Sequence, residues 1–323
     1  NIYQKLKKIN MKKILITGGT GTVGQSFIKQ YYNDYEFYNI SRNETNHTEL
    51  KRSFPKVHCF IGDICNLDHM INLFCKIKPD IVIHAAALKH INLAEENPTS
   101  AVEINIVGSL NIIKASVRAE VPLTIGVSTD KACNPDSVYG YTKRMMETMF
   151  MEYHNDKTNF VCTRFANVAN SNGSVIPFWV SEAKKGNQLK LTDPGMNRLM
   201  FSKKDSAKLI HKAIKGKHAN KSFILCKLMK NVNLLELAEL LSDKEIELVG
   251  KRPGEKLNET LISEKELPFT SIVDDYVYII NEKQPKVATL FANSNNLIKE
   301  HSSANAEWMS TKEMEKLVYE NNI

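Results

Sequence analysis

Residues 129–143 combine side chains that could move a proton and a hydride at one carbon atom. The spacing Tyr139-x-x-x-Lys143 places both side chains on one face of a helix. An ammonium group beside a phenol favours the phenolate and lowers a pKa that is otherwise about 10. A phenolate can then take a proton from a hydroxyl while a hydride leaves the same carbon. Just upstream, Thr129, Asp130 and Lys131 supply a hydroxyl, a carboxyl and an amine.

The elements around these side chains favour a ligand site. Residues 121–127 form an apolar run that predicts a buried parallel strand. Side chains at the carboxyl end of such a strand face the ligand crevice of an α/β sheet. The alternative is a solvated turn followed by an ordinary amphipathic helix, because Tyr-x-x-x-Lys alone is common. A nucleotide-binding start earlier in the chain favours the site.

That start is the apolar strand 12–17, followed by a G-x-x-G-x-x-G pattern and a helix over 22–32. The first glycine allows a tight turn, the second lets the backbone approach a pyrophosphate, and the third lets the helix pack on the strand. The helix N-terminus then faces the phosphates. The expected cofactor contacts here are Gly18, Thr20, Gly21, Thr22, Val23 and Gly24.

The end of the second predicted strand, 36–40, indicates which dinucleotide is bound. An NAD site usually carries a carboxylate there for the ribose hydroxyl. This chain has Ser41 and Arg42, which suit a 2′-phosphate, so NADP is favoured over NAD. The alternative is that Arg42 is only a surface residue of a loop.

Two further strands, 57–62 and 81–84, end in residues that can line the same cofactor site. Asp63 can receive the adenine amino group, or it can cap a helix near Leu67. The small residues after 84 let a ribose lie close to the backbone, or they only pack. The expected contacts are Asp63, Ile64, Ala85, Ala86 and Ala87.

The 323 residues, 42% of them hydrophobic, suit a well-cored domain and a smaller lobe. We expect an α/β protein: a Rossmann-like, doubly wound parallel sheet with a smaller mixed C-terminal lobe. Residues 1–10 are predicted to be a disordered extension before a natural start at Met11. Residues 11–170 are the predicted NADP-binding domain, to which some later segments return, and 171–323 are mainly the substrate lobe.

Charge and cysteine usage exclude several classes. The net charge of +7 comes from scattered lysines without an arginine-rich or aromatic stripe, which argues against nucleic acid and suits an anionic nucleotide. No apolar run approaches the roughly 20 residues of a membrane span, and no secretory leader is visible. The six cysteines form no C-x-x-C pair, so we expect reduced thiols, no metal site and a cytoplasmic enzyme.

In the second half, Asn167 follows a predicted strand over 160–165, at the same sheet edge as residues 129–131. A Pro-Gly turn is flanked by Arg252 and Glu255, which could clamp a diphosphate and accept from ribose hydroxyls. The alternative is an exposed charged turn that caps a helix.

Together these motifs resemble the extended short-chain dehydrogenase/reductases that act on nucleotide-sugars. Within them the chain resembles the soluble UDP-N-acetylglucosamine 4,6-dehydratases that invert C5 and begin the pseudaminic acid pathway. The resemblance covers roughly 14–318, and Thr129-Asp-Lys is its most specific part. It is carried by residues 17–21, 41–42, 84–90, 94–95, 97–98, 105–106, 128–132, 134–135, 139–143, 167–168, 173–178 and 252–257.

The resemblance implies a mechanism. Tyr139 takes the proton of the sugar 4-hydroxyl as NADP takes the hydride, Lys143 holds the nicotinamide ribose, and Thr129 bonds the 4-oxygen. Lys131 then removes the C5 proton, Asp130 protonates the departing 6-hydroxyl, and the hydride returns to C6. Further implied cofactor contacts are Lys89, Asn105, Tyr139, Lys143 and Asn167. Implied UDP-N-acetylglucosamine contacts are Lys89, Asn167, Ser174, Val175, Thr192, Met196, Arg198, Arg252 and Glu255.

The resemblance also implies a homo-oligomer, a dimer or hexamer, built on helices near 101–118 and 138–155. Three alternatives stay open: the same dehydration with C5 retained, a 4-epimerase, and a non-catalytic NADP-binding protein. An epimerase has no need of the Asp130-Lys131 pair, and non-catalytic relatives usually lose Tyr139-x-x-x-Lys143. The chain departs from the family at Asn170, Gly195 and Asn197, where a Gly, an Arg and a Thr are usual.

Overall fold

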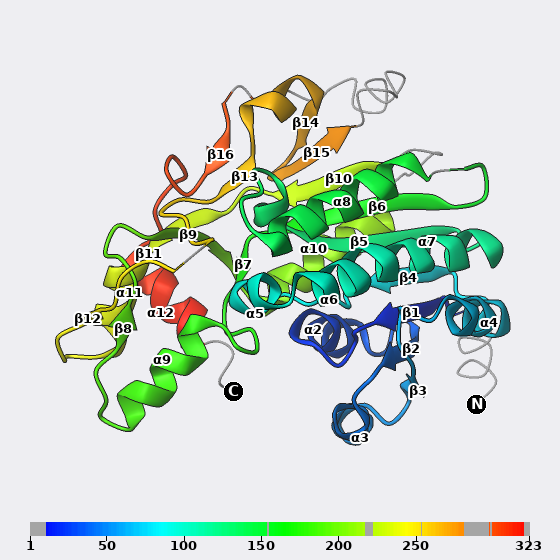
Figure 1. Cartoon of the computed structure of the whole chain (residues 1–323), viewed down its shortest axis with the longest axis horizontal. Coiled ribbons are helices and arrows are strands. Elements are labelled where there is room, and N and C mark those ends of the chain that lie inside the picture. The colour runs from blue at the N-terminus through cyan, green and yellow to red at the C-terminus, as the bar shows by residue number, and fades with distance from the viewer. Residues whose placement is uncertain are drawn as a thin grey trace.

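The computed structural model describes residues 11–153, 155–216, 222–252, 254–280, 297 and 299–319; the extension expected at 1–10 lies outside them. A nine-stranded sheet with the order β14-β15-β10-β6-β5-β4-β1-β2-β3 forms its centre (Figure 1). In that order, the neighbouring strands from β10 through to β3 pair parallel to one another. Strand β15 pairs antiparallel with β10, and β14 pairs antiparallel with β15. The strands are β1 (Lys13–Thr17), β2 (Glu36–Ser41), β3 (His58–Ile61), β4 (Ile81–His84), β5 (Leu123–Thr129), β6 (Asn159–Phe165), β10 (Phe223–Lys227), β14 (Thr270–Val273) and β15 (Tyr276–Ile280).

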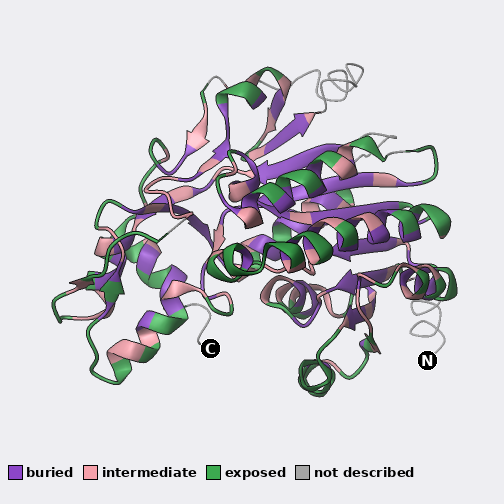
Figure 2. Cartoon of the chain, in the orientation of Figure 1, coloured by how far each residue is buried: buried purple, intermediate pink, exposed green. Residues whose placement is uncertain are grey.

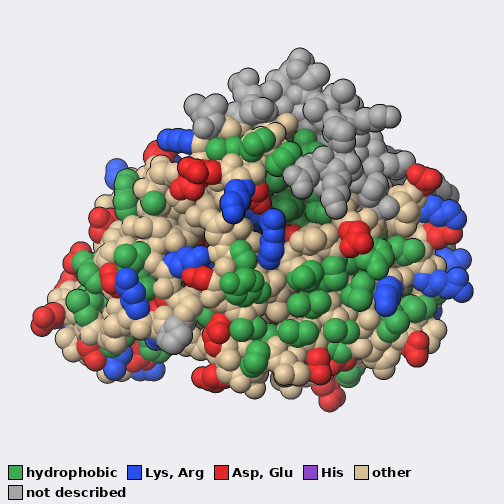
Figure 3. Space-filling model, turned by 45° about the horizontal axis from the view of Figure 1, so that its top comes forward, with side chains coloured by type: hydrophobic (Ala, Val, Ile, Leu, Met, Phe, Trp, Pro, Cys, Tyr) green, Lys and Arg blue, Asp and Glu red, His purple; other side chains and the backbone are tan. Residues whose placement is uncertain are grey.

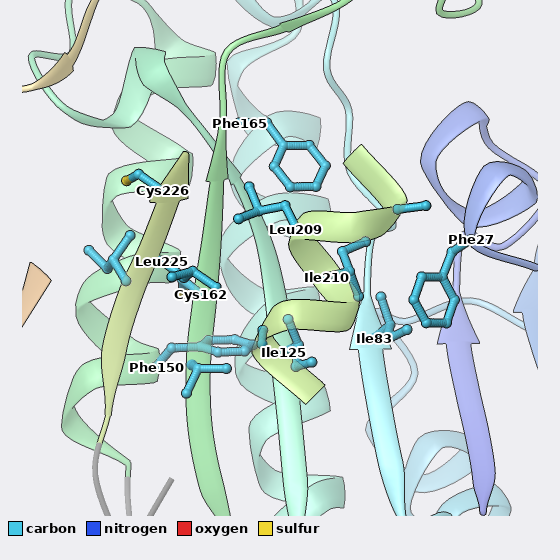
Figure 4. Close-up of a cluster of buried hydrophobic side chains, with 14 of the residues drawn as sticks. Phe27, Ile83, Ile125, Phe150, Cys162, Phe165, Leu209, Ile210, Leu225 and Cys226 are labelled. Atoms are coloured by element: carbon cyan, nitrogen blue, oxygen red, sulfur yellow. The ribbon is translucent and has the colours of Figure 1, made fainter. Parts of the chain in front are cut away.

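Alternation along β1 explains why the sheet is covered on both faces. Ile14 and Ile16 join one core cluster, whereas Leu15 joins another, because successive side chains of a strand point to opposite faces. Helices α2 (Thr22–Tyr31) and α10 (Lys203–Lys215) contribute to the first cluster, and α4 (Leu67–Ile77) and α7 (Gly108–Arg118) contribute to the second. Figure 4 shows Leu209 and Ile210 of α10 among the side chains of the sheet. The expected doubly wound α/β fold is confirmed.

The helices around this sheet begin at recognisable caps. Asn43, Asn66 and Ser137 each accept a hydrogen bond from a backbone N–H of the first turn of α3, α4 and α8. The helices are α2 (Thr22–Tyr31), α3 (Glu44–Ser53), α4 (Leu67–Ile77), α5 (Ile91–Glu96), α6 (Pro98–Val102), α7 (Gly108–Arg118), α8 (Val138–Glu152) and α10 (Lys203–Lys215).

The later part of the chain contributes to two regions. Strands β10, β14 and β15 extend the main sheet, and small sheets with the orders β11-β9-β7, β12-β8 and β13-β16 lie beside it. A separate core cluster within residues 169–318 joins α9, α11 and α12 (Figure 2). These elements are β7 (Asn167–Val168), α9 (Val175–Lys184), β8 (Lys190–Leu191), β9 (Asn197–Phe201), β11 (Lys230–Asn233), α11 (Leu234–Leu241), β12 (Glu247–Leu248), β13 (Thr260–Ile262), β16 (His301–Ser302) and α12 (Thr311–Tyr319).

The strand register places the carboxyl ends of β1, β4 and β5 at one edge of the sheet. Thr17 pairs with His84 and His84 with Gly126, so the glycine-rich turn after β1 and the residues after β5 leave the same edge of the sheet, on either side of β4. Within the described part of the chain, every helix is too short or too polar to cross a bilayer.

Candidate active site

A pocket of about 550 Å³ opens at this edge of the sheet. Its wall is formed by the glycine-rich turn, the loops after β2, β3 and β4, the end of β5, the start of α8 and the segment after β6. Most of the residues expected from the sequence line it: Gly18, Thr20, Gly21, Thr22, Val23, Gly24, Ser41, Arg42, Asp63, Ile64, Ala85, Ala86, Ala87, Lys89, Thr129, Lys131, Tyr139, Lys143 and Asn167.

The glycine-rich turn fits a dinucleotide. Gly18 has a φ of 72°, and a Cβ there would lie 2.8 Å from the Ala86 backbone nitrogen. A Cβ at Gly24 would lie 2.4 Å from the Gly19 Cα, so only glycine lets α2 approach the turn. Gly21 occupies the N-cap of α2 without a side-chain acceptor, which leaves the first N–H groups free for a pyrophosphate.

The end of β2 presents a hydroxyl and a guanidinium to the pocket. Thr20 donates a 3.3 Å hydrogen bond to the Ser41 hydroxyl, and the His47 Nε2 lies 2.9 Å from the same oxygen. Arg42 stays 64% exposed in its side chain and forms a long ion pair of 3.9 Å with Asp63. The Arg42 guanidinium can therefore bind a phosphate without first losing a strong partner. His47 was missed because its contact with Ser41 depends on how α3 packs on β2.

Asp63 and Asn105 differ from the expectation in informative ways. The cap of α4 is Asn66, so the alternative that Asp63 caps this helix is wrong; Asp63 accepts instead from Cys65 N at 2.9 Å.

Asn105 lies in a π-helical turn, is 1% exposed and does not line the pocket. Its amide binds both backbone groups of Leu88, at 2.8 and 3.0 Å. It therefore holds the loop after β4 in place.

Thr129, Asp130 and Lys131 form a compact hydrogen-bonded group. The Thr129 hydroxyl donates to Asp130 Oδ1 at 2.9 Å, and the Lys131 ammonium lies 3.2 Å from the same oxygen. The Asp130 side chain is fully buried and lies behind the pocket lining, and no donor among the described residues reaches its Oδ2. Burial, and then the nearby Glu259 carboxylate, raise the pKa of Asp130 to about 7.

Glu259, just before β13, is a second site residue that the sequence analysis missed. Its carboxylate lies 2.9 Å from the Lys131 ammonium and 3.5 Å from Arg198 Nε, and it accepts from Asn167 at 3.0 Å. Burial opposes ionisation of Glu259, but Lys131 and Arg198 outweigh it and lower its pKa. Although burial lowers the pKa of Lys131, Asp130 and Glu259 raise it overall, so Lys131 is an ammonium in this ligand-free state.

Tyr139 and Lys143 both reach the pocket from the first turns of α8. Burial raises the pKa of Tyr139 to about 12, and the charge that opposes this shift is Lys131. Lys143 is not the neighbour that lowers it, contrary to the expectation from spacing. Its ammonium donates to the Met146 sulfur at 3.0 Å, and burial lowers its own pKa to about 8.

Most of the expected sugar-nucleotide contacts lie outside the pocket lining. Met196 is 1% exposed in the second core, where Thr192 and Arg198 contact its sulfur. The Arg252 N–H donates to the Glu255 carboxylate at 3.0 Å within its turn. The residues outside the lining are Asp130, Asn105, Ser174, Val175, Thr192, Met196, Arg198, Arg252 and Glu255.

One departure from the family has a structural explanation. Asn170, where a glycine is usual, adopts a φ of 57°, a region that asparagine tolerates better than most residues. Its amide donates to Leu317 O at 2.9 Å and to Val318 O at 3.1 Å, which ties the segment after β7 to α12.

The turn, the strand order and the Tyr-x-x-x-Lys pair together define an extended short-chain dehydrogenase/reductase. The chain belongs to the polysaccharide biosynthesis protein family, whose model matches residues 14–281. The resemblance found from the sequence is thereby confirmed at the level of the family.

Individual relatives cover nearly the whole chain. It is 35% identical to a Methanocaldococcus jannaschii protein described as an uncharacterized membrane protein, over 96% of each chain. It is 33% identical to the inverting UDP-N-acetylglucosamine 4,6-dehydratase of Campylobacter jejuni, over 96% of this chain and 98% of that one. It is 30% identical to a UDP-glucose 4-epimerase of Rickettsia massiliae, over 95% of each. The solved structure of Pen from Bacillus thuringiensis, 29% identical, matches with a TM-score of 0.86 over 97% of this chain and 98% of that one.

Proposed function

We propose that the protein is an NADP-dependent lyase that dehydrates UDP-N-acetylglucosamine at C4 and C6 and inverts C5. Its product would be a UDP-linked 4-keto-6-deoxy sugar of the L-arabino series, a precursor of pseudaminic acid. The observation that carries the proposal is the acid/base group Asp130-Lys131-Glu259 beside Tyr139. The inverting dehydratases of Campylobacter jejuni support the reaction and the substrate.

The residues divide the reaction into two halves. Bound NADP supplies a hydride acceptor and donor. In the first half Tyr139 takes the proton of the 4-hydroxyl, and Thr129 holds the 4-oxygen. In the second half Lys131 takes the C5 proton, and Asp130 gives its proton to the departing 6-hydroxyl, which leaves as water. Since two carboxyl groups hold Lys131 as an ammonium, it must first pass a proton to Glu259, 2.9 Å away.

The cofactor preference belongs to the same proposal. The Ser41 hydroxyl and the mostly free Arg42 guanidinium suit the 2′-phosphate of NADP. We further propose that the sugar nucleotide lies between the pocket and the lobe of residues 171–323. Lys89 and Asn167 line the pocket, and we propose that they contact the sugar nucleotide where the pocket meets this lobe. Lys89 already donates a hydrogen bond to Asn172 O of the lobe at 2.7 Å.

The rivals make different products from the same nucleotide-sugar. A 4-epimerase returns the hydride to C4, needs no acid/base pair for elimination and releases no water. The epimerase alternative is tested as well, because one relative of this chain is described as a UDP-glucose 4-epimerase. A retaining dehydratase would give the D-xylo ketone.

One experiment separates these outcomes. Incubate the protein with NADP and UDP-N-acetylglucosamine in D₂O and record proton spectra before the ketone epimerises in solution. The first product should carry deuterium at C5 and show L-arabino couplings. D-xylo couplings in that first product would assign the retaining reaction, and a product that keeps its 6-hydroxyl would assign the epimerase.

A further inference from the structure

The Glu259 carboxylate is held in one place by the fold. The residue is 7% exposed. Its backbone N–H donates to the Ser303 hydroxyl at 2.9 Å, and its carbonyl accepts from Ser303 N at 2.9 Å. Asn167 and Arg198 then fix the carboxylate against Lys131. A carboxylate placed so firmly beside a catalytic amine is expected to control protons there.

The pair Asp130-Lys131 by itself would be in the wrong ionic state for elimination. An Asp carboxyl 3.2 Å from a Lys ammonium ordinarily ionises, because the positive charge favours the carboxylate. An ionised Asp130 has no proton to give to a leaving hydroxyl. Something else must neutralise Lys131 if Asp130 is to stay protonated.

Glu259 meets that requirement. Two carboxyl groups that share one buried site do not both ionise easily. The charged groups that face Glu259 are Asp130, Lys131 and Arg198. Glu259 has Arg198 and Asn167 as additional partners, whereas Asp130 Oδ2 has no donor among the described residues. The negative charge therefore settles on Glu259, in keeping with the raised pKa of Asp130 and the lowered pKa of Glu259.

We infer that Glu259 is the positioning residue that sets the protonation of the catalytic pair, acting as counter-ion to Lys131 so that Asp130 stays a neutral acid. The inference rests on the proposed dehydration. It also completes the proton balance. Lys131 passes a proton to Glu259 and takes the C5 proton, while the Asp130 proton leaves in water as the C6–O bond breaks. Glu259 then returns its proton to Asp130. A solvent water on the opposite face gives C5 its new proton, and the hydroxide that remains takes the proton that Tyr139 removed from the 4-hydroxyl.

The first test reads the Asp130 carboxyl directly, without turnover. Infrared titration follows the protonated carboxyl band that disappears in Asp130→Asn. In the wild type this band should be lost near pH 7. In Glu259→Gln the loss should move to lower pH by at least about one unit, which is tenfold in the proton equilibrium. In Glu264→Gln, where an exposed carboxylate of the same region is removed, the titration should match the wild type. An unshifted band in Glu259→Gln overturns the inference.

The second test separates the two halves of the reaction in a single turnover. Above pH 7, Glu259→Gln should still oxidise C4, so that reduced nicotinamide accumulates, while dehydration falls at least about tenfold. Glu259→Asp, which keeps a carboxylate near Lys131, should recover part of the dehydration rate. A wild-type pH profile in Glu259→Gln overturns the inference.

Two controls keep the outcomes separate. If Glu259→Gln does not fold, Glu259→Asp still tests the inference: drawing the carboxylate back by one methylene must lower the Asp130 titration partway. If the wild type never dehydrates the sugar but the Glu259→Gln band shifts, the proposed function fails while the control of Asp130 by Glu259 stands. If neither variant shifts the band although the wild type dehydrates, the inference fails and the proposed function stands.

Discussion

Arg164 and Glu147 form a bidentate ion pair, with distances of 2.9 and 2.8 Å, in which neither side chain reaches solvent. The pair joins β6 to α8, the helix that carries Tyr139 and Lys143. Glu266 binds the same guanidinium at 2.8 and 3.0 Å, so a third segment is tied to the helix. The helix that carries Tyr139 and Lys143 is therefore anchored by a buried charge network as well as by packing.

Breaking this network should destabilise the fold. Arg164→Met leaves two buried carboxylates with only the half-exposed Arg144 as a cation, which should lower the free energy of unfolding by about 3–5 kcal/mol. The matched control is Arg144→Met: Arg144 is 45% exposed in its side chain and contacts the same carboxylates at 3.4 and 3.6 Å. This change should cost about 1 kcal/mol or less. Urea unfolding measures both, and equal losses would contradict the account.

The cofactor assignment predicts a selective effect at Arg42. Arg42→Ala should weaken NADP binding far more than NAD binding, because only NADP carries the 2′-phosphate that the guanidinium is proposed to bind. Calorimetric titration with each dinucleotide measures the difference. Lys56→Ala, which removes an exposed cation remote from the pocket lining, should change neither. Equal losses for the two cofactors in Arg42→Ala would rule out the 2′-phosphate contact.

The two halves of the reaction should separate by mutation. Tyr139→Phe removes the hydroxyl that is proposed to accept the 4-hydroxyl proton, so no reduced nicotinamide should form. Lys131→Ala should still permit some oxidation at C4 but stall elimination, so reduced nicotinamide should persist. Each loss of turnover should be about 10²–10⁴-fold, as for one general acid or base. Dehydration near the wild-type rate in Lys131→Ala would show that another group is the base.

The raised pKa of Asp130 predicts a pH-dependent stability. The folded-state pKa of about 7 lies above the ordinary value of 3.8, so the folded state binds a proton that the unfolded state has lost. The contribution of this carboxyl to stability is therefore complete below pH 3.8 and is lost as the pH rises through 7. Relative to Asp130→Asn, the wild type should lose stability across that window. A difference between the two proteins that does not change with pH would contradict the buried, protonated carboxyl.

The expected homo-oligomer gives a prediction for the surface. Large exposed apolar side chains lie in the segment from α5 to α8: Leu93, Val102, Val107, Tyr141 and Met145. Figure 3 shows hydrophobic side chains gathered on one face of the molecule. If this face joins two copies, Tyr141→Glu should convert the protein to a smaller species in sedimentation experiments. Phe178→Glu, at an exposed position on α9, should leave the assembly unchanged. A wild-type monomer would remove the prediction.

Local patterns in the sequence determined strands β1 to β6 of the sheet and the nucleotide end of the pocket. The apolar run predicted at 81–84 is strand β4 over Ile81–His84, and the helix predicted from Thr22 begins there. Gly18 and Gly24 were placed correctly because tight turns and close helix packing restrict the residue type strongly. Such signals are local, and each is complete within a few neighbouring residues.

Only the tertiary structure decided the ionic state of the site. Glu259 reaches Lys131 because the segment before β13 returns to the end of β5, a contact that no local pattern encodes. The spacing of Tyr139 and Lys143 predicted a lowered phenol pKa, yet burial raises it, since desolvation depends on everything that surrounds the hydroxyl. Spacing along the chain determines which side chains share a face. Burial and charge, which fix where each proton resides, arise only when distant segments close around that face.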